Sequence, residues 1–149
     1  MAHVRRPLIL LAATLLPAFA FASESAARST RRALTTWDSV YTIEQAGRGE
    51  TTYATTCSRC HQAALGGADE APALTGSAFM GSWNGQTLQS LHDRVRTTMP
   101  TDTPGTYSRQ DIADVLAYML KFNQFPAGKT ELPSGDEELK AITFVSTKP

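Results

Sequence analysis

The chain has 149 residues, with 14 basic and 14 acidic side chains and a formal net charge of zero at pH 7. This length suits one domain with a modest hydrophobic core. The balanced charge lacks the basic excess that a nucleic-acid-binding protein would show, so we expect a single domain with no nucleic-acid partner.

The first 22 residues have the pattern of a cleaved export signal. A basic head with Arg5 and Arg6 precedes a nearly continuous apolar run over residues 8–21, and small residues stand at the expected cut. The run is short for a membrane span, although a retained anchor helix is the alternative interpretation. We predict that residues 1–22 are a signal peptide cleaved after Ala22, which gives a periplasmic protein without a membrane anchor.

The next segment is predicted to be a flexible leader. Residues 23–36 contain mostly Ser, Ala, Thr and Arg without apolar periodicity. The folded domain is therefore placed at residues 37–149. Its first predicted helix covers residues 42–56, because Thr42 can cap it and Gln45 stands three residues further on, as in a capping box.

A long loop and a second helix are expected in the middle of the chain. Gly, Ala and Pro are frequent in residues 62–86, which predicts a loop with a turn of helix around Phe79. A helix over residues 87–98 would carry apolar side chains on one face, and Pro100 would end it.

The clearest pattern belongs to the last helix. Ser108 followed by Asp111 resembles a capping box, and apolar residues recur at helical spacing from Ile112 to Leu120. Residues 127–149 carry Gly, Pro and charges with scattered apolar residues, so we expect a tail that wraps the surface. Since no segment alternates as a strand does, the predicted class is all-α, with three to five helices and long loops.

The two cysteines of the chain, Cys57 and Cys60, lie three residues apart, with His61 directly after the second. A dithiol oxidoreductase would place such a pair at the start of a helix in a βαβ unit. A zinc site would need two ligands besides the cysteines, and beyond His61 only His92 remains in the predicted mature chain. A short disulfide is a further alternative. The pattern Cys-x-x-Cys-His is typical of covalent haem attachment, in which both thiols bond to haem vinyl groups and the histidine ligates iron.

Similarity to a known family extends over five segments within residues 37–145. They read YTIEQAGRGETTYATTCSRCH, APALTGSAFMGSWNGQTL, RVRTTMP, DVLAYMLKFNQFPAG and ELPSGDEELKAI. These segments resemble class I c-type cytochromes, in particular the small exported cytochromes c associated with quinoprotein (PQQ-dependent) dehydrogenases. The resemblance implies a cytochrome c-like fold around one covalently attached haem c. It also implies electron transfer between periplasmic redox proteins, with a PQQ-dependent dehydrogenase as donor and a terminal oxidase or another cytochrome as acceptor.

Four side chains could supply the second axial ligand: Met80, Met99, Met119 and His92. Met119 belongs to the apolar stripe of the last helix, which favours a core position. Met80 lies in a Gly-rich stretch, and His92 is interpreted as a surface or boundary residue. Met99 ends a helix before Pro100 and matches the methionine of the family's TTMP segment. We predict His61 and Met99 as the iron ligands.

The resemblance also assigns supporting roles. In the family a proline carbonyl accepts the second N–H of the iron-binding histidine, and Pro72 is the candidate, with an ordinary loop proline as the alternative. Trp83, Arg94 and Arg96 are candidates for contacting haem propionates. Gly49 is expected to let the first and last helices cross closely.

Ligation by His and Met raises the reduction potential of a haem and leaves no open position at iron. We therefore interpret the chain as an electron carrier and not as an enzyme. One alternative is a haem enzyme or gas-binding protein with a displaceable sixth ligand. Another is a permanently bound haem subunit of a dehydrogenase.

Overall fold

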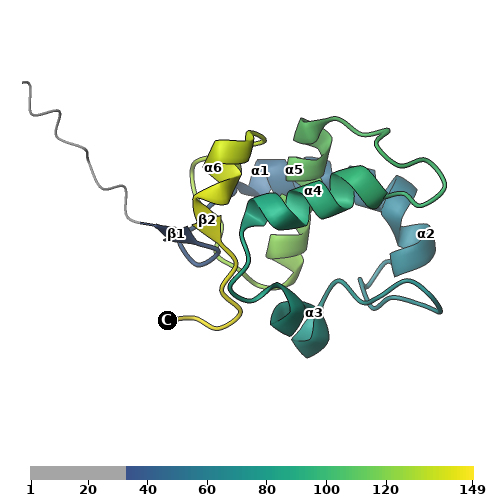
Figure 1. Cartoon of the computed structure of the whole chain (residues 1–149), viewed down its shortest axis with the longest axis horizontal. Helices are drawn as coiled ribbons and strands as arrows, with labels where there is room; N and C mark the ends of the chain where they lie inside the picture. The colour runs from purple at the N-terminus through teal and green to yellow at the C-terminus, as the bar shows by residue number, and fades with distance from the viewer. Residues whose placement is uncertain (1–32) are drawn as a thin grey trace, which may run out of the picture. The chain divides into compact units, whose positions relative to one another are not determined.

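The computed structural model describes residues 33–149, so the predicted signal peptide and residues 23–32 of the predicted leader lie outside the described part (Figure 1). The elements follow in this order: β1 (Leu34–Thr35), α1 (Ile43–Thr52), the π-helix η1 (Tyr53–Cys57), α2 (Ser58–His61), α3 (Gly76–Trp83), α4 (Leu88–Thr98), α5 (Arg109–Phe122), α6 (Asp136–Lys140) and β2 (Ile142–Thr143). Helices predominate, which confirms the predicted all-α class.

Local hydrogen bonds set the starts of α1 and α5. Thr42 Oγ1 accepts the N–H of Gln45 at 3.1 Å, and a complete capping box joins Ser108 and Asp111. Such caps satisfy backbone N–H groups that have no partner inside a helix. The expected capping box at α1 is only half formed, because the Gln45 amide pairs with the backbone of Leu132 instead.

The first and last long helices pack directly against each other (Figure 1). Gly49 of α1 faces the backbone of Asp114 in α5 without room for a side chain between them. One turn further on, the rings of Tyr53 and Tyr118 lie 5.2 Å apart between centroids. The close crossing expected from Gly49 is therefore present, and it fixes the helix that leads into the two cysteines.

The C-terminal segment enters the core, where only a surface tail was expected. Leu132, Leu139 and Phe144 are fully buried. The ring of Phe144 packs edge-on against Phe79 of α3 and against Phe125, with centroids 5.9 and 5.4 Å apart. Burial of scattered apolar residues is not visible as a periodic pattern, which is why the sequence did not indicate it.

The start of the domain also differs from the expected boundary. The leader was predicted to reach residue 36, but Leu34 and Thr35 form β1, which pairs in parallel with Ile142 and Thr143 of β2. Thr36 is fully buried, and its hydroxyl donates to the carbonyl of residue 145. A two-residue strand carries no alternation to read, so only its partner reveals it.

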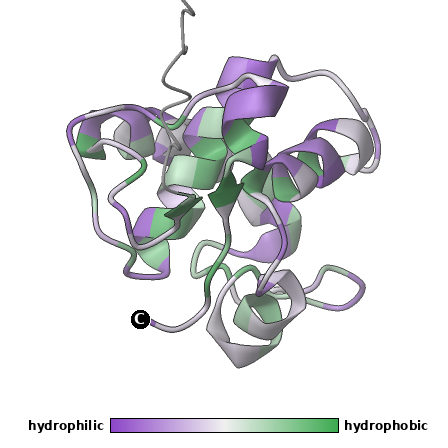
Figure 2. Cartoon of the chain, turned by 60° about the vertical axis from the view of Figure 1, so that its left-hand side comes forward, coloured by the Kyte–Doolittle hydropathy of each residue, from purple (hydrophilic) through white to green (hydrophobic). Residues whose placement is uncertain are grey.

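Most of the helices are coloured as hydrophobic on one side and hydrophilic on another (Figure 2). This pattern is typical of helices that cover one shared core. Within residues 33–149, no helix is both long enough and apolar enough to cross a membrane.

Candidate functional site

The cysteine motif lies on a helical segment that changes its winding immediately before it. The π-helix η1 ends at Cys57, and α2 carries Cys60 and His61. The predicted helix was expected to stop at residue 56, whereas the helical backbone continues to His61. Short π-helices often occur at functional sites, but no residue pattern announces them.

The two thiols are free and differ in exposure. Cys57 is partly buried and Cys60 is exposed, and no disulfide joins them. Burial raises the pKa of the Cys57 thiol, and the positive charge of Arg59 opposes this rise. The disulfide alternative is therefore absent from this structure, and both sulfur atoms remain available for bonding to a ligand.

The imidazole of His61 is held in one tautomer. Its Nδ1 lies 2.8 Å from the carbonyl oxygen of Pro72, and only 8% of the residue is exposed. Because a carbonyl can only accept, Nδ1 carries the proton, and Nε2 keeps a lone pair that can ligate a metal. The contact expected for Pro72 is therefore present.

A glycine shapes the loop that brings Pro72 to the histidine. Gly67 has a φ of +73°, and its N–H donates to the carbonyl of His61 at 3.1 Å. A Cβ on Gly67 would lie between 2.5 and 2.7 Å from backbone atoms of residues 71–73. Only glycine allows both this positive φ and this close approach.

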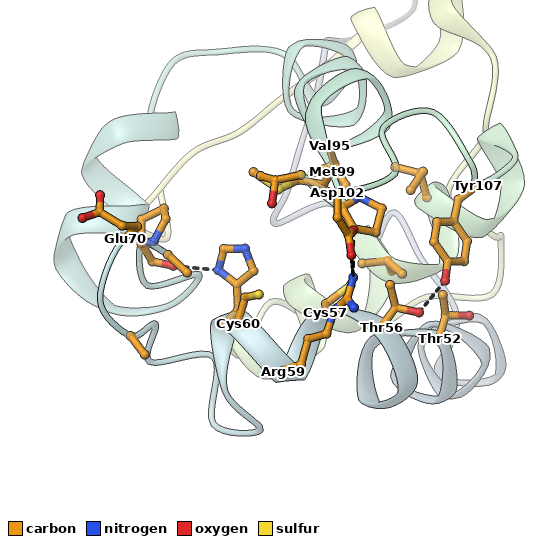
Figure 3. Close-up of a pocket in the computed structure, with 18 of the residues that line it drawn as sticks. Thr52, Thr56, Cys57, Arg59, Cys60, Glu70, Val95, Met99, Asp102 and Tyr107 are labelled. Atoms are coloured by element: carbon orange, nitrogen blue, oxygen red, sulfur yellow. Dashed lines mark hydrogen bonds and ion pairs between the residues drawn. The ribbon is translucent and has the colours of Figure 1, made fainter.

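Two adjoining cavities, of about 540 and 640 Å³, lie between the cysteine motif and the start of the loop after α4. Figure 3 shows the smaller one. Volumes of this order are typical of cofactor sites. Both cavities are lined by Cys57, His61, Pro72, Val95, Met99 and Val115. In Figure 3, Cys57 and Cys60 lie on the α2 side, and Val95 and Met99 lie across from them.

Met99 is the methionine that the structure brings to both cavities. It caps the C-terminus of α4, where its N–H donates to the carbonyl of Val95 at 2.9 Å. Met119 lines one cavity and is buried in the core, while Met80 lines neither. This placement is compatible with Met99 as ligand, which stays a prediction.

The candidates for propionate contacts separate into two groups. Trp83 and Arg94 line the larger cavity, whereas Arg96 lines neither cavity. The Nε atom of Arg96 is buried without a hydrogen-bond partner and lies 3.8 Å from the Asp93 carboxylate. Arg96 therefore faces away from the site.

The expected surface position of His92 is wrong. His92 is fully buried, and its Nε2 lies 3.0 Å from the carbonyl oxygen of Arg109, to which it donates. It lines neither cavity. The packing of α4 against α5 covers this side of α4, which the sequence of α4 alone does not show.

Two contacts at the site were missed by sequence reasoning. The Arg59 guanidinium binds the Asp102 carboxylate, and the hydroxyls of Thr56 and Tyr107 are hydrogen-bonded. Each pair joins the cysteine segment to the loop after Met99. Their partners are 43 and 51 residues apart in the chain, so no local pattern could have indicated them.

The donor set fits a covalently attached haem. Two free thiols, an imidazole whose Nδ1 is hydrogen-bonded to Pro72 and a thioether sulfur line cavities of cofactor size. Nitrogen and thioether sulfur are the axial ligands of electron-transfer haems of the c type. Cys57 and Cys60 would hold a haem covalently, and His61 and Met99 would be the ligands to its iron.

Comparisons with known proteins concern the family and the fold of the chain. The model of the family described as cytochrome c oxidase, cbb3-type, subunit III, matches residues 44–119. The crystal structure of the sulfane dehydrogenase SoxCD from Paracoccus pantotrophus has a similar fold, with a TM-score of 0.53 and 21% identity. That match covers 72% of this chain and 61% of the other, so less than two thirds of the matched chain is represented. Curated proteins give no match, and neither comparison names a quinoprotein dehydrogenase.

Proposed function

Because the chain belongs to the family described as cytochrome c oxidase, cbb3-type, subunit III, we propose that it is an electron carrier with one covalently attached haem c. The family match covers just over half of the chain and makes it a c-type cytochrome domain, whose chemistry is haem electron transfer. One observation supports His61 and Met99 as the iron ligands. Cys57 and His61 line one wall of both cavities, and Met99 lines the other wall.

Each residue of the site has a separate task in this proposal. Cys57 and Cys60 would hold the haem covalently, each through a thioether bond to a vinyl group. His61 would hold iron through Nε2, while its Nδ1–H donates to the Pro72 carbonyl, which fixes the ring and strengthens it as a ligand. Met99 would supply the second iron ligand. A haem held in this way would provide a one-electron couple.

A carrier is favoured over a haem enzyme because His61 and Met99 would together leave no open position at iron. The alternative of a displaceable sixth ligand would require Met99 to leave iron readily. A permanently bound dehydrogenase subunit shares the same haem chemistry, and gel filtration of native extract separates it from a free carrier.

We further propose export to the periplasm, with cleavage after Ala22, so that the mature chain begins at Ser23. The donor is proposed to be a PQQ-dependent dehydrogenase and the acceptor a terminal oxidase or another cytochrome. The donor rests on the sequence resemblance alone. Stopped-flow mixing of reduced dehydrogenase with the ferric protein tests it, with an unrelated cytochrome as the reference for non-specific reduction.

The central experiment measures haem content and ligation. Intact mass should equal the chain from Ser23 plus one haem that acid-acetone does not extract. Met99→Ala should abolish the weak red sulfur–iron band of the ferric protein and lower the reduction potential. Met80→Ala and Met119→Leu should keep the band. A haem-free Cys57–Cys60 disulfide would overturn the proposal, and loss of the band in Met80→Ala alone would reassign the ligand.

A further inference from the structure

The loop that follows Met99 is fastened to the cysteine segment at two points. The Arg59 Nη2 lies 2.9 and 2.8 Å from the two carboxylate oxygens of Asp102. The Thr56 and Tyr107 hydroxyls form the second contact, and both contacts are drawn in Figure 3. Arg59 stands between the two cysteines in the chain, so the ion pair joins the two walls of the cavity.

Asp102 lies in the turn that begins directly after Met99. The Thr103 N–H donates to the Pro100 carbonyl at 3.1 Å and closes this turn around residues 101 and 102. On its other side, Met99 is held by the last turn of α4 through its bond to Val95. The backbone of Met99 is thus fixed to a helix on one side and to a turn on the other.

We propose that Arg59 and Asp102 are positioning residues that hold the Met99 turn against the haem-attachment segment and so keep the methionine sulfur on iron. This inference rests on the proposed function, in which Met99 is the axial ligand. The Thr56–Tyr107 contact anchors the far end of the same loop. Asp102 lies three residues after Met99. If the turn opened at Asp102, the backbone next to Met99 would move, and the bond from the Met99 sulfur to iron would weaken.

The strength of this contact is limited by solvent. The Arg59 and Asp102 side chains are 54% and 57% exposed, and exposed ion pairs shift an equilibrium by at most about fivefold. Salt screens such pairs. The contact is therefore expected to bias the methionine toward iron at low ionic strength and to lose much of this effect at high salt.

The test is a titration of the ferric protein with imidazole, a neutral ligand that competes with methionine. Loss of the red sulfur–iron band reports displacement. Arg59→Gln and Asp102→Asn should each raise the apparent imidazole affinity by roughly two- to fivefold at low salt. The double variant should show no more than the larger single effect, because both changes remove one contact. The charge swap Arg59→Asp with Asp102→Arg should restore part of the original affinity.

Removing a charge near the haem could by itself change the imidazole affinity, without any effect on the position of Met99. The direction of the change in each variant separates these two causes. Removing a positive charge and removing a negative charge should shift the reduction potential in opposite directions. Both variants should nevertheless raise the imidazole affinity, since both release the turn. Opposite changes of imidazole affinity would show an electrostatic effect alone and would overturn the proposal.

Lys121→Gln provides a matched control. Lys121 pairs with Glu50 at 3.1 Å, with side chains 41% and 52% exposed, and this pair lines neither cavity. Its loss should leave imidazole affinity unchanged. If Arg59→Gln and Asp102→Asn behave like this control while the wild-type band is present, positioning by the ion pair is refuted and the carrier function stands. If the wild type has no band, methionine ligation fails, and the positioning role fails with it.

Discussion

The carbonyl group of Asp114 occupies the space in which a side chain at position 49 would stand. A Cβ built on Gly49 would lie 1.8 Å from the Asp114 carbonyl oxygen and 2.3 Å from its carbonyl carbon. Backbone atoms within α5 cannot move aside without displacing the helix. The distance between α1 and α5, and with it the position of the cysteine segment, therefore depends on the absence of a side chain at this point.

Gly49→Ala should destabilise the haem-loaded protein by about 2 kcal/mol or more, because the helices must separate to admit the methyl group. Gly47→Ala is the control, since Gly47 lies in the same helix and a Cβ there meets nothing within 4 Å. It should stabilise the protein by up to about 1 kcal/mol through helix propensity. Urea unfolding followed by circular dichroism measures both, and equal effects of the two substitutions would contradict the close crossing.

Gly67→Ala should raise the reduction potential by on the order of tens of millivolts. Alanine cannot keep the positive φ or the close approach to residues 71–73, so the Pro72 carbonyl should move from His61 and the imidazole should become a weaker donor to ferric iron. A Cβ on Gly66 would meet only the Gln62 side chain, at 3.7 Å, so Gly66→Ala is the control. Redox titration measures the reduction potential of both variants. An unchanged potential in Gly67→Ala would show that the loop does not set the donor strength of His61.

The Asp114 carboxylate joins α5 to α1. Arg48 donates from Nε and Nη2 at 2.8 and 3.0 Å, and Gln110 donates at 2.8 Å. Burial alone would raise the pKa of Asp114, but these hydrogen bonds and one from Gln45 lower it below the ordinary value. The exposed Glu131 shares the same arginine, at 2.9 Å.

Because the folded pKa of Asp114 is lowered, its contribution to stability is present above the ordinary aspartate pKa of about 3.9 and is lost as the pH falls through the lower folded pKa. Asp114→Asn should therefore cost on the order of 1–3 kcal/mol at neutral pH and flatten the fall in stability below about pH 4. Glu131→Gln should have a smaller effect. Urea midpoints measured from pH 3 to 7 test this, and identical pH profiles for Asp114→Asn and wild type would exclude the assigned role.

Gln45 ties the C-terminal segment to α1 through both of its amide atoms. Its Nε2 donates to the Leu132 carbonyl at 2.9 Å, and its Oε1 accepts the Leu132 N–H at 2.6 Å. Gln45→Met keeps the approximate shape but leaves two buried backbone groups unpaired, which should cost about 2–4 kcal/mol. Thermal unfolding should show the loss, and limited proteolysis should cut near residues 127–135 faster than in the wild type. Gln89→Met, on α4, serves as the control, and equal losses would contradict a special role for Gln45.

Several features could be predicted from the sequence because they depend on residues that are neighbours along the chain. The Cys57–His61 spacing, the cap at Thr42 and the capping box at Ser108 all join residues within a few positions of one another. The apolar repeat of α5 likewise follows from the period of the helix itself. These features indicated the all-α class and the family before any distance was known.

The tertiary structure decided the contacts that span long stretches of chain. Gln45 bonds to Leu132, which is 87 residues away in the chain, and Arg59 bonds to Asp102, which is 43 residues away. The sequence around each of these residues gives no indication of its partner. The burial of His92 likewise depends on where α5 lies against α4, not on its position within α4. Hydrogen bonds along a helix are fixed by its geometry, whereas long-range partners meet only when the whole core packs and brings their segments together.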